Sequence, residues 1–178
     1  MAFITVPEGL MGISGPMAQY PNTARHLNGL AEDLLRTDES LTKGERELIA
    51  TYVSSQNECK FCANTHGAAA KFQLDGGQSV VDQVRADFTQ AAISEKMKAL
   101  LVIAGKVQQG GLRVTEDDVA LARREGADDR AIHDTVLIAA AFCMYNRYVD
   151  GLRTTALPND AAYDAVGRRL AAEGYTRK

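Results

Sequence analysis

Apolar side chains recur every three or four residues along most of this chain, and this spacing limits its fold more than any other feature. Leu27, Leu30 and Leu34 show it near the start, and the same period returns around Leu100 and Leu121. Residues at that spacing lie on one face of an α-helix. No segment alternates polar and apolar residues as a half-buried strand would. The sequence therefore predicts an all-α fold.

Capping residues and glycines divide this pattern into separate helices. Thr42 with Glu45, and Thr115 with Asp118, form capping boxes at two helix starts. Ser94 is expected to cap a third helix by accepting a hydrogen bond from a free backbone N–H. The predicted helices cover residues 23–36, 42–56, 57–72, 79–85, 94–109, 115–125, 128–152 and 158–174.

The length and composition fit one domain. With 178 residues, of which 46% are apolar and 24% charged, the chain can bury a core without disulfides or metal. Residues 1–20 contain two prolines and three glycines and lack the basic start of a signal peptide, so we expect an irregular arm there. The sequence therefore predicts a single domain over residues 1–178, with this arm at its N-terminus.

Charge and hydropathy argue against two classes of partner. The net charge is −3 and the basic residues are scattered, so nucleic acid is not an expected partner. The longest apolar run, residues 136–145, is about half of the ~20 residues that span a bilayer, so no membrane partner is expected either. We expect a soluble, cytoplasmic protein.

Two of the three cysteines lie close together, which favours redox chemistry or metal binding over structural disulfides. On a regular helix Cys59, Cys62 and His66 share one face, since they stand at positions i, i+3 and i+7. The first turn of a helix lowers the pKa of a thiol, and His66 is placed to accept a proton from Cys62. We therefore expect Cys62 to be the cysteine that attacks the substrate and Cys59 the one that then closes a disulfide with it. The helix terminus, in contrast, favours Cys59 as the attacking cysteine.

A carboxylate on the preceding helix can complete this group. Glu47 lies on the helix side that carries Ala50, Thr51 and Ser54, away from the apolar face. From there it could orient His66 and stabilise its imidazolium form, as the acid of a catalytic triad does. Glu58 is an alternative for this role.

This constellation resembles a known family. Glu47, eleven residues, Cys59-x-x-Cys62 and three residues to His66 are similar to the pattern of the AhpD-like alkylhydroperoxidases, within the carboxymuconolactone decarboxylase superfamily. The segment around Asn146-Arg147-x-x-Asp150 resembles a late segment of its peroxidase-related members. The resemblance covers residues 41–72 and 136–152. It departs at Phe61, where the best-known members have a histidine.

The resemblance implies a helical bundle of about seven to eight helices, with residues 42–73 as a redox helix pair. It also implies a homotrimer or homohexamer that reduces organic hydroperoxides and is recharged by a dithiol, either a small molecule or a lipoyl- or thioredoxin-like protein. Glu47, Cys59, Cys62 and His66 would form the proton relay and redox centre. The thiolate would attack the peroxide to give a sulfenic acid, which the other cysteine converts to a disulfide. No cofactor or resident metal is expected.

Other interpretations of these residues stay open. Cys59, Cys62, His66 and Glu47 could instead bind zinc in a scaffold protein. The pair could serve a general thiol-disulfide oxidoreductase or a redox sensor, whereas a lactone decarboxylase has no evident need for it. Cys143 is expected to be core packing. Asn146, Arg147 and Asp150 are interpreted as a buried polar cluster that fixes helix packing, and His26 and His133 as ordinary helix residues.

Overall fold

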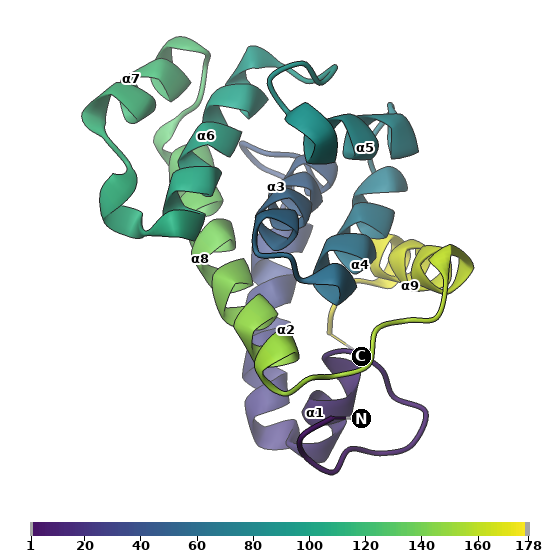
Figure 1. The fold of residues 1–178 in the computed structure, drawn as a ribbon. Helices are drawn as coiled ribbons and strands as arrows, with labels where there is room; N and C mark the ends of the chain where they lie inside the picture. The colour runs from purple at the N-terminus through teal and green to yellow at the C-terminus, as the bar shows by residue number, and fades with distance from the viewer. Residues whose placement is uncertain (1, 177–178) are drawn as a thin grey trace.

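The structure, a computed structural model, describes residues 2–176, and these contain nine α-helices, one short 3-10 helix and no strand (Figure 1). The predicted all-α fold is confirmed. The helices are α1 Ser14–Gln19, α2 Pro21–Arg36, α3 Lys43–Gln56, α4 Lys60–Lys71, α5 Gly77–Asp87, α6 Glu95–Gln109, η1 Gly111–Arg113, α7 Glu116–Arg124, α8 Asp129–Gly151 and α9 Asp160–Glu173.

Local capping explains where these helices begin. Both capping boxes are present, with Thr42 accepting from the N–H of Glu45 and Thr115 from the N–H of Asp118. The Ser94 side chain caps α6, as predicted. Asp128 and Asn159 cap α8 and α9 in the same way, each satisfying one otherwise free N–H.

The N-terminal arm differs from the expectation of an irregular segment. Residues 14–19 form α1, and the chain before it is bound to the segment that follows α8. The Phe3 N–H donates to the Leu152 carbonyl at 3.0 Å, and the Gly12 N–H donates to the Thr155 carbonyl at 2.8 Å. The arm is therefore a fixed part of the fold, which local sequence patterns do not reveal because its partners lie about 140 residues away.

Helix α4 starts later than predicted. Glu58 has a positive φ of 57°, which ends helical geometry between α3 and α4. Cys59 follows as the N-cap of α4, and its N–H donates to the Ser54 carbonyl at 3.0 Å. Cys59 thus lies just before the helix that carries Cys62 and His66, rather than on its face.

Helix α3 is the centre of the molecule. It packs against α2, α4, α5, α6 and α8, and Leu48, Ile49 and Val53 are fully buried in these contacts. Arg46 on α3 and Asp134 on α8 form a buried ion pair at 2.7 Å that joins the two helices. Such a pair tolerates little displacement, because separating it leaves a buried charge without a partner.

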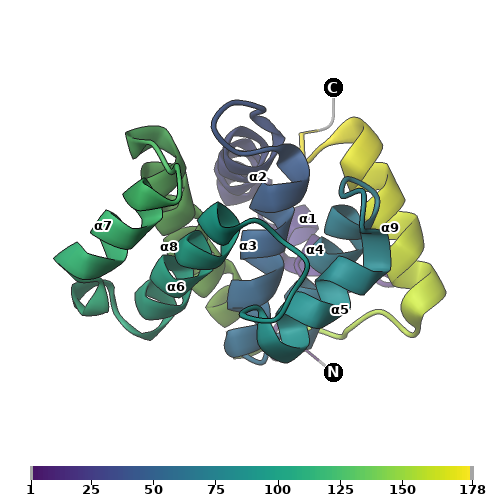
Figure 2. The same cartoon turned by 90° about the horizontal axis from the view of Figure 1, so that it is seen from above.

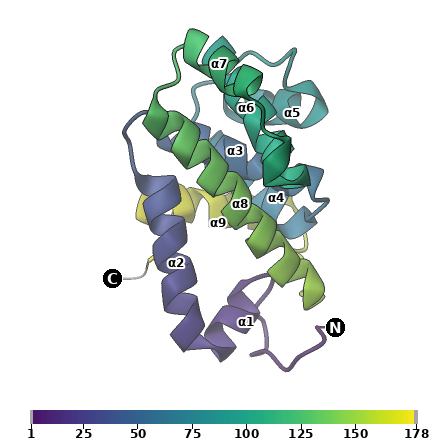
Figure 3. The same ribbon diagram turned by 90° about the vertical axis from the view of Figure 1, so that its left-hand side faces the viewer.

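Helix α4 lies between α3 and α9, and α2 lies beside α8 (Figures 2 and 3). This arrangement places the cysteine segment between the central helix and the C-terminal helix. No helix within residues 2–176 combines the length and the hydropathy needed to cross a membrane.

Candidate active site

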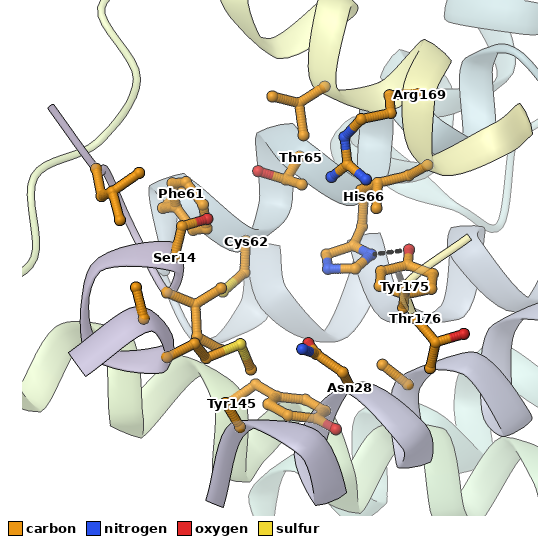
Figure 4. Close-up of a pocket in the computed structure, with 18 of the residues that line it drawn as sticks. Ser14, Asn28, Phe61, Cys62, Thr65, His66, Tyr145, Arg169, Tyr175 and Thr176 are labelled. Atoms are coloured by element: carbon orange, nitrogen blue, oxygen red, sulfur yellow. Dashed lines mark hydrogen bonds between the residues drawn. The ribbon is translucent and has the colours of Figure 1, made fainter. Parts of the chain in front are cut away.

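One face of α4 forms a wall of a cavity of about 580 Å³ (Figure 4). Phe61, Cys62, Thr65 and His66 supply this wall. The remaining walls come from α1, α2, α8, α9 and both ends of the chain, and they are mostly apolar; they include Leu10, Ile13, Met17, Phe142, Tyr145 and Leu170. A cavity of this size and lining suits a small apolar molecule that carries few polar atoms.

Phe61 makes the cavity more apolar at the position where the resembling family has a histidine. Its ring is buried and packs near the Tyr163 ring, with centroids 6.4 Å apart. Gly12 lies so close to the Phe61 ring that a side chain at position 12 would overlap it. The arm therefore holds Phe61 in place, and the wall next to Cys62 carries no titratable group from position 61.

The two cysteines differ in access. Both are free thiols, and both are buried. Cys62 lines the cavity, whereas Cys59 is 0% exposed and does not line it. A molecule in the cavity can therefore reach the Cys62 sulfur directly, while the Cys59 sulfur lies behind it.

The surroundings of Cys62 favour its protonated form. A hydrogen bond with Cys59 raises the pKa of the Cys62 thiol, and burial and the negative charge of Asp150 raise it further. A hydrogen bond with Asn146 acts in the opposite direction. In the resting dithiol the Cys62 proton is therefore retained within the cysteine pair, and nucleophilic attack requires a base.

His66 and Glu47 lie in direct contact. His66 Nδ1 is 2.8 Å from Glu47 Oε2, and the carboxylate is completely buried. The edge of the His66 ring also meets the Phe142 ring, with centroids 4.5 Å apart. The contact that the sequence suggested between the predicted helices of residues 42–56 and 57–72 is present. Glu58 is exposed and does not replace Glu47.

Tyr175 is a site residue that sequence reasoning missed. Its hydroxyl donates to Glu47 Oε1 and lies 3.2 Å from His66 Nδ1. Its ring stacks on the His66 ring, with an interplanar angle of 11°. Burial raises the pKa of the Tyr175 phenol well above its ordinary value, and the negative charge of Glu47 and the hydrogen bond to it add to this effect. No sequence signal marked it, since it lies beyond the last helix.

The residues Asn146, Arg147 and Asp150 do not form a buried cluster, which corrects the sequence interpretation. Only Asn146 is buried; its amide donates to Ser54 Oγ at 3.0 Å and accepts from Asn57 at 2.8 Å. Arg147 and Asp150 are exposed; Arg147 follows Asn146 directly and so points to another side of α8, while Asp150 lies one turn further toward the exposed end of the helix. Asn146 is therefore the member of this motif that lies beside the cysteines.

The four predicted site residues form two pairs, Glu47 with His66 and Cys59 with Cys62. Within residues 2–176 neither thiol is hydrogen-bonded to His66. His66 and Cys62 instead line the same cavity (Figure 4).

The zinc alternative requires at least three ligands that converge on one point. Within residues 2–176 no three His, Cys, Asp or Glu side chains do so. Cys143 is half-buried, with its sulfur 3.6 Å from the Asn57 amide.

Comparison with known proteins gives related sequences and folds. The profile of the carboxymuconolactone decarboxylase family matches residues 21–76, which contain Glu47, Cys59, Cys62 and His66. A crystal structure from Ralstonia eutropha JMP134, described as an alkylhydroperoxidase AhpD core and an uncharacterized peroxidase-related protein, is 30% identical. The match covers 89% of this chain and 82% of that chain, with a TM-score of 0.78.

A second crystal structure, of an uncharacterized peroxidase-related protein from Silicibacter sp. TM1040, is 29% identical. The match covers 84% of this chain and 76% of that chain, with a TM-score of 0.74. No curated protein sequence matches this chain. The similarity therefore extends over most of the fold and includes the segment that carries the candidate site.

Proposed function

The chain belongs to the AhpD-like branch of the carboxymuconolactone decarboxylase superfamily, and from this membership we propose that it is a thiol-dependent peroxidase for alkyl hydroperoxides. Cys59 and Cys62 would cycle between the dithiol and the disulfide. One observation carries the proposal: Cys62 lies on the wall of an apolar cavity that also contains His66, with the Cys59 sulfur directly behind it. An alkyl hydroperoxide has the apolar body and the few polar atoms that this cavity would accept.

The chemistry takes two steps. The Cys62 thiolate attacks the terminal peroxide oxygen, so that an S–O bond forms, the O–O bond breaks and the alcohol leaves after taking up a proton. The Cys59 thiol then attacks the sulfur of the Cys62 sulfenic acid, forming the disulfide and releasing water. One hydroperoxide is reduced and two thiols are oxidised. The access of Cys62 to the cavity supports this order of attack.

His66 and Glu47 would move the protons. Because the surroundings of Cys62 hold its pKa high, a base must remove the thiol proton as attack begins. His66 faces the same cavity, and a hydroperoxide bound between the two side chains would pass the proton from sulfur to the imidazole. Glu47 would stabilise the imidazolium that results, since its carboxylate is 2.8 Å from Nδ1.

A dithiol must then reduce the disulfide. We propose a small-molecule dithiol or a lipoyl- or thioredoxin-like protein as this reductant, and the cytoplasm as the location, where thiols are kept reduced. Family membership also supports assembly as a homotrimer or homohexamer.

The test is a thiol count on reduced, metal-free protein before and after one equivalent of an alkyl hydroperoxide. Two of the three thiols should be lost rapidly, and Cys143→Ser, the matched control, should still lose two. Cys59→Ser should stop at a Cys62 sulfenic acid that a sulfenic-acid trap captures, while Cys62→Ser should react slowly. His66→Ala should slow the loss by about 10²-fold or more. No thiol loss, together with zinc in the untreated protein, would remove the proposal.

A redox sensor is the second candidate, because Cys62 lines the cavity and Cys59 lies next to it as a resolving cysteine, the arrangement that redox sensors use. Steady-state turnover with an excess of dithiol separates the two functions. A peroxidase continues to consume hydroperoxide, whereas a sensor stops after one equivalent.

A further inference from the structure

The C-terminal tail beyond α9 is held by two side chains of α2. Arg36 donates to the carbonyls of Leu170 and Ala171, at 3.3 and 2.6 Å, and so caps the last turn of α9. Glu32 Oε2 then accepts the backbone N–H of Tyr175 at 2.6 Å. Between these contacts the chain turns at Gly174, whose φ of +82° favours glycine and whose missing side chain makes room for the Glu32 carboxylate.

These contacts direct the Tyr175 side chain inward. Its hydroxyl reaches Glu47 and His66, which are separated from it by 128 and 109 residues in the sequence. Within residues 2–176, His66 and Tyr175 are the two side chains that hydrogen-bond to the Glu47 carboxylate, one to each oxygen. Loss of the Tyr175 hydroxyl would therefore leave one oxygen of a fully buried carboxylate without a donor, which is costly in a protein interior.

The same contacts determine which nitrogen of His66 carries the proton. The single hydroxyl proton of Tyr175 is given to Glu47, so the phenol oxygen faces Nδ1 as an acceptor. Glu47 Oε2 is also an acceptor, and it is 2.8 Å from Nδ1. With two acceptors on this side, Nδ1 must be protonated and Nε2 free. Figure 4 shows the far side of the imidazole turned toward the cavity, away from Tyr175.

We propose that Tyr175 is a positioning residue, held in place by the contacts between the tail and α2. Its hydroxyl fixes Glu47 and the Nδ1–H tautomer of His66, so that Nε2 of His66 can act as the base in the cavity. This inference rests on the proposed function for its catalytic consequence. It adds a third member to the proton relay, and it makes the relay depend on a tail contact outside the cysteine segment.

Charged groups from α2, α3 and α9 surround the Tyr175 phenol. Glu47 on α3 raises the pKa of Tyr175, and the cations Arg36 on α2 and Arg169 on α9 act in the opposite direction. Among the residues that the structure describes, His66 on α4 is the remaining titratable neighbour in contact. Because burial and Glu47 prevail, Tyr175 keeps its proton and remains a donor throughout the neutral range.

The first arm of the test is a nitrogen NMR spectrum of protein labelled with ¹⁵N-histidine. The chain has three histidines, and His66→Gln identifies the signals of His66. The wild-type protein should show the Nδ1–H tautomer. Tyr175→Phe keeps the stacked ring but removes the hydroxyl, and it should shift the population toward Nε2–H. Glu32→Ala, which removes the carboxylate that accepts the backbone N–H of Tyr175, should shift it in the same direction, while the exposed Tyr20→Phe should not.

The second arm is kinetic. Tyr175→Phe should lower kcat/KM for an alkyl hydroperoxide by about 10- to 100-fold, the usual effect of losing a partner that orients a functional side chain. The loss should fall on kcat, because Tyr175 acts through Glu47.

The two arms separate the two hypotheses. If His66 keeps the Nδ1–H tautomer in Tyr175→Phe, Tyr175 has no positioning role. If His66 keeps this tautomer in Glu32→Ala, the contacts of the tail with α2 do not position Tyr175. A wild-type protein that fails to reduce hydroperoxides would remove the proposed function, while the spectrum would still decide the positioning. A lower kcat with an unchanged His66 tautomer would show a merely structural effect and would also overturn the proposal.

Discussion

At the residue scale, the two sulfurs have different surroundings although only two residues separate them. Cys59 caps α4 and is completely buried, whereas Cys62 lies in the first turn and meets the cavity. Access to the cavity favours Cys62 as the attacking sulfur. The hydrogen bond with Cys59 raises the pKa of this thiol, so the sulfur that substrate can reach is also the one that needs a base.

The raised pKa of Cys62 can be tested by removing its main cause. Cys59→Ala eliminates the hydrogen bond and the charge of Cys59, so the pKa of Cys62 should fall toward its ordinary value. The thiolate fraction at neutral pH then rises, and alkylation of Cys62 by iodoacetamide should become faster, by up to about tenfold for each pKa unit recovered.

The measurement is the rate of Cys62 alkylation against pH, followed by mass spectrometry of its peptide. Cys143→Ala is the matched control and should leave the Cys62 profile unchanged. An identical midpoint in Cys59→Ala and the wild type would show that Cys59 does not raise the pKa of Cys62.

At the element scale, the site depends on how closely α9 approaches α4. A Cβ added at Gly167 would lie 2.5 Å from the Ala68 carbonyl carbon and 2.6 Å from its Cβ. The two helix backbones can come this close because Gly167 has no side chain. The approach sets the position of the last turn of α9, and with it the position of the tail that carries Tyr175.

Gly167→Ala should therefore destabilise the protein, although alanine favours helices. Overpacking of this kind lowers the free energy of unfolding by about 1–3 kcal/mol. Gly29→Ala on α2 is the matched control, because a Cβ there meets no atom within 4 Å. That change should raise the free energy of unfolding by about 0.5–1 kcal/mol.

Urea denaturation of the two variants measures both values. Equal stability changes at the two glycines would show that α4 and α9 are not in backbone contact. Gly167→Ala should in addition weaken the hydrogen bond between Tyr175 and Glu47, since α9 must move outward to accept the methyl group.

At the scale of the whole molecule, the cavity is partly enclosed by the N-terminal segment and by the tail after α9. Leu10 and Met17 from the N-terminal segment and Tyr175 from the C-terminal tail line it together with α4. The redox segment supplies the reactive groups, and the chain termini supply much of the enclosure. We therefore expect changes in the termini to alter substrate selection and proton transfer rather than the cysteine chemistry itself.

Assembly is a further property at this scale. The proposed homotrimer or homohexamer needs an apolar contact surface, and α8 exposes apolar side chains at Leu137 and Met144, which are 38% and 42% exposed and two turns apart on one face. Sedimentation velocity should show an oligomer, and Leu137→Glu should shift it toward the monomer because a charge would be buried in the contact. Leu112→Glu, at a fully exposed leucine of η1, should have no effect. A monomeric wild type would contradict this prediction.

The sequence by itself determined helices α2 to α9, though not α1, and the candidate residues of the redox segment. Helix ends depend on contacts within one turn, such as Thr42 with Glu45, so they can be identified from neighbouring residues. The contact between Glu47 and His66 could be predicted because a short connection joins their helices and the motif resembles a known family. The prediction failed locally at Cys59, where the left-handed backbone of Glu58 delays the start of α4.

Tertiary structure alone decided which groups complete and enclose the site. Tyr175 meets Glu47 across 128 residues, and the arm meets the end of α8 across a similar distance. Such contacts arise when helices pack and bring distant side chains together, and no periodicity or capping signal encodes them. The different access of Cys59 and Cys62, and the separation of buried Asn146 from exposed Arg147, follow from the same packing because burial depends on what lies opposite each residue.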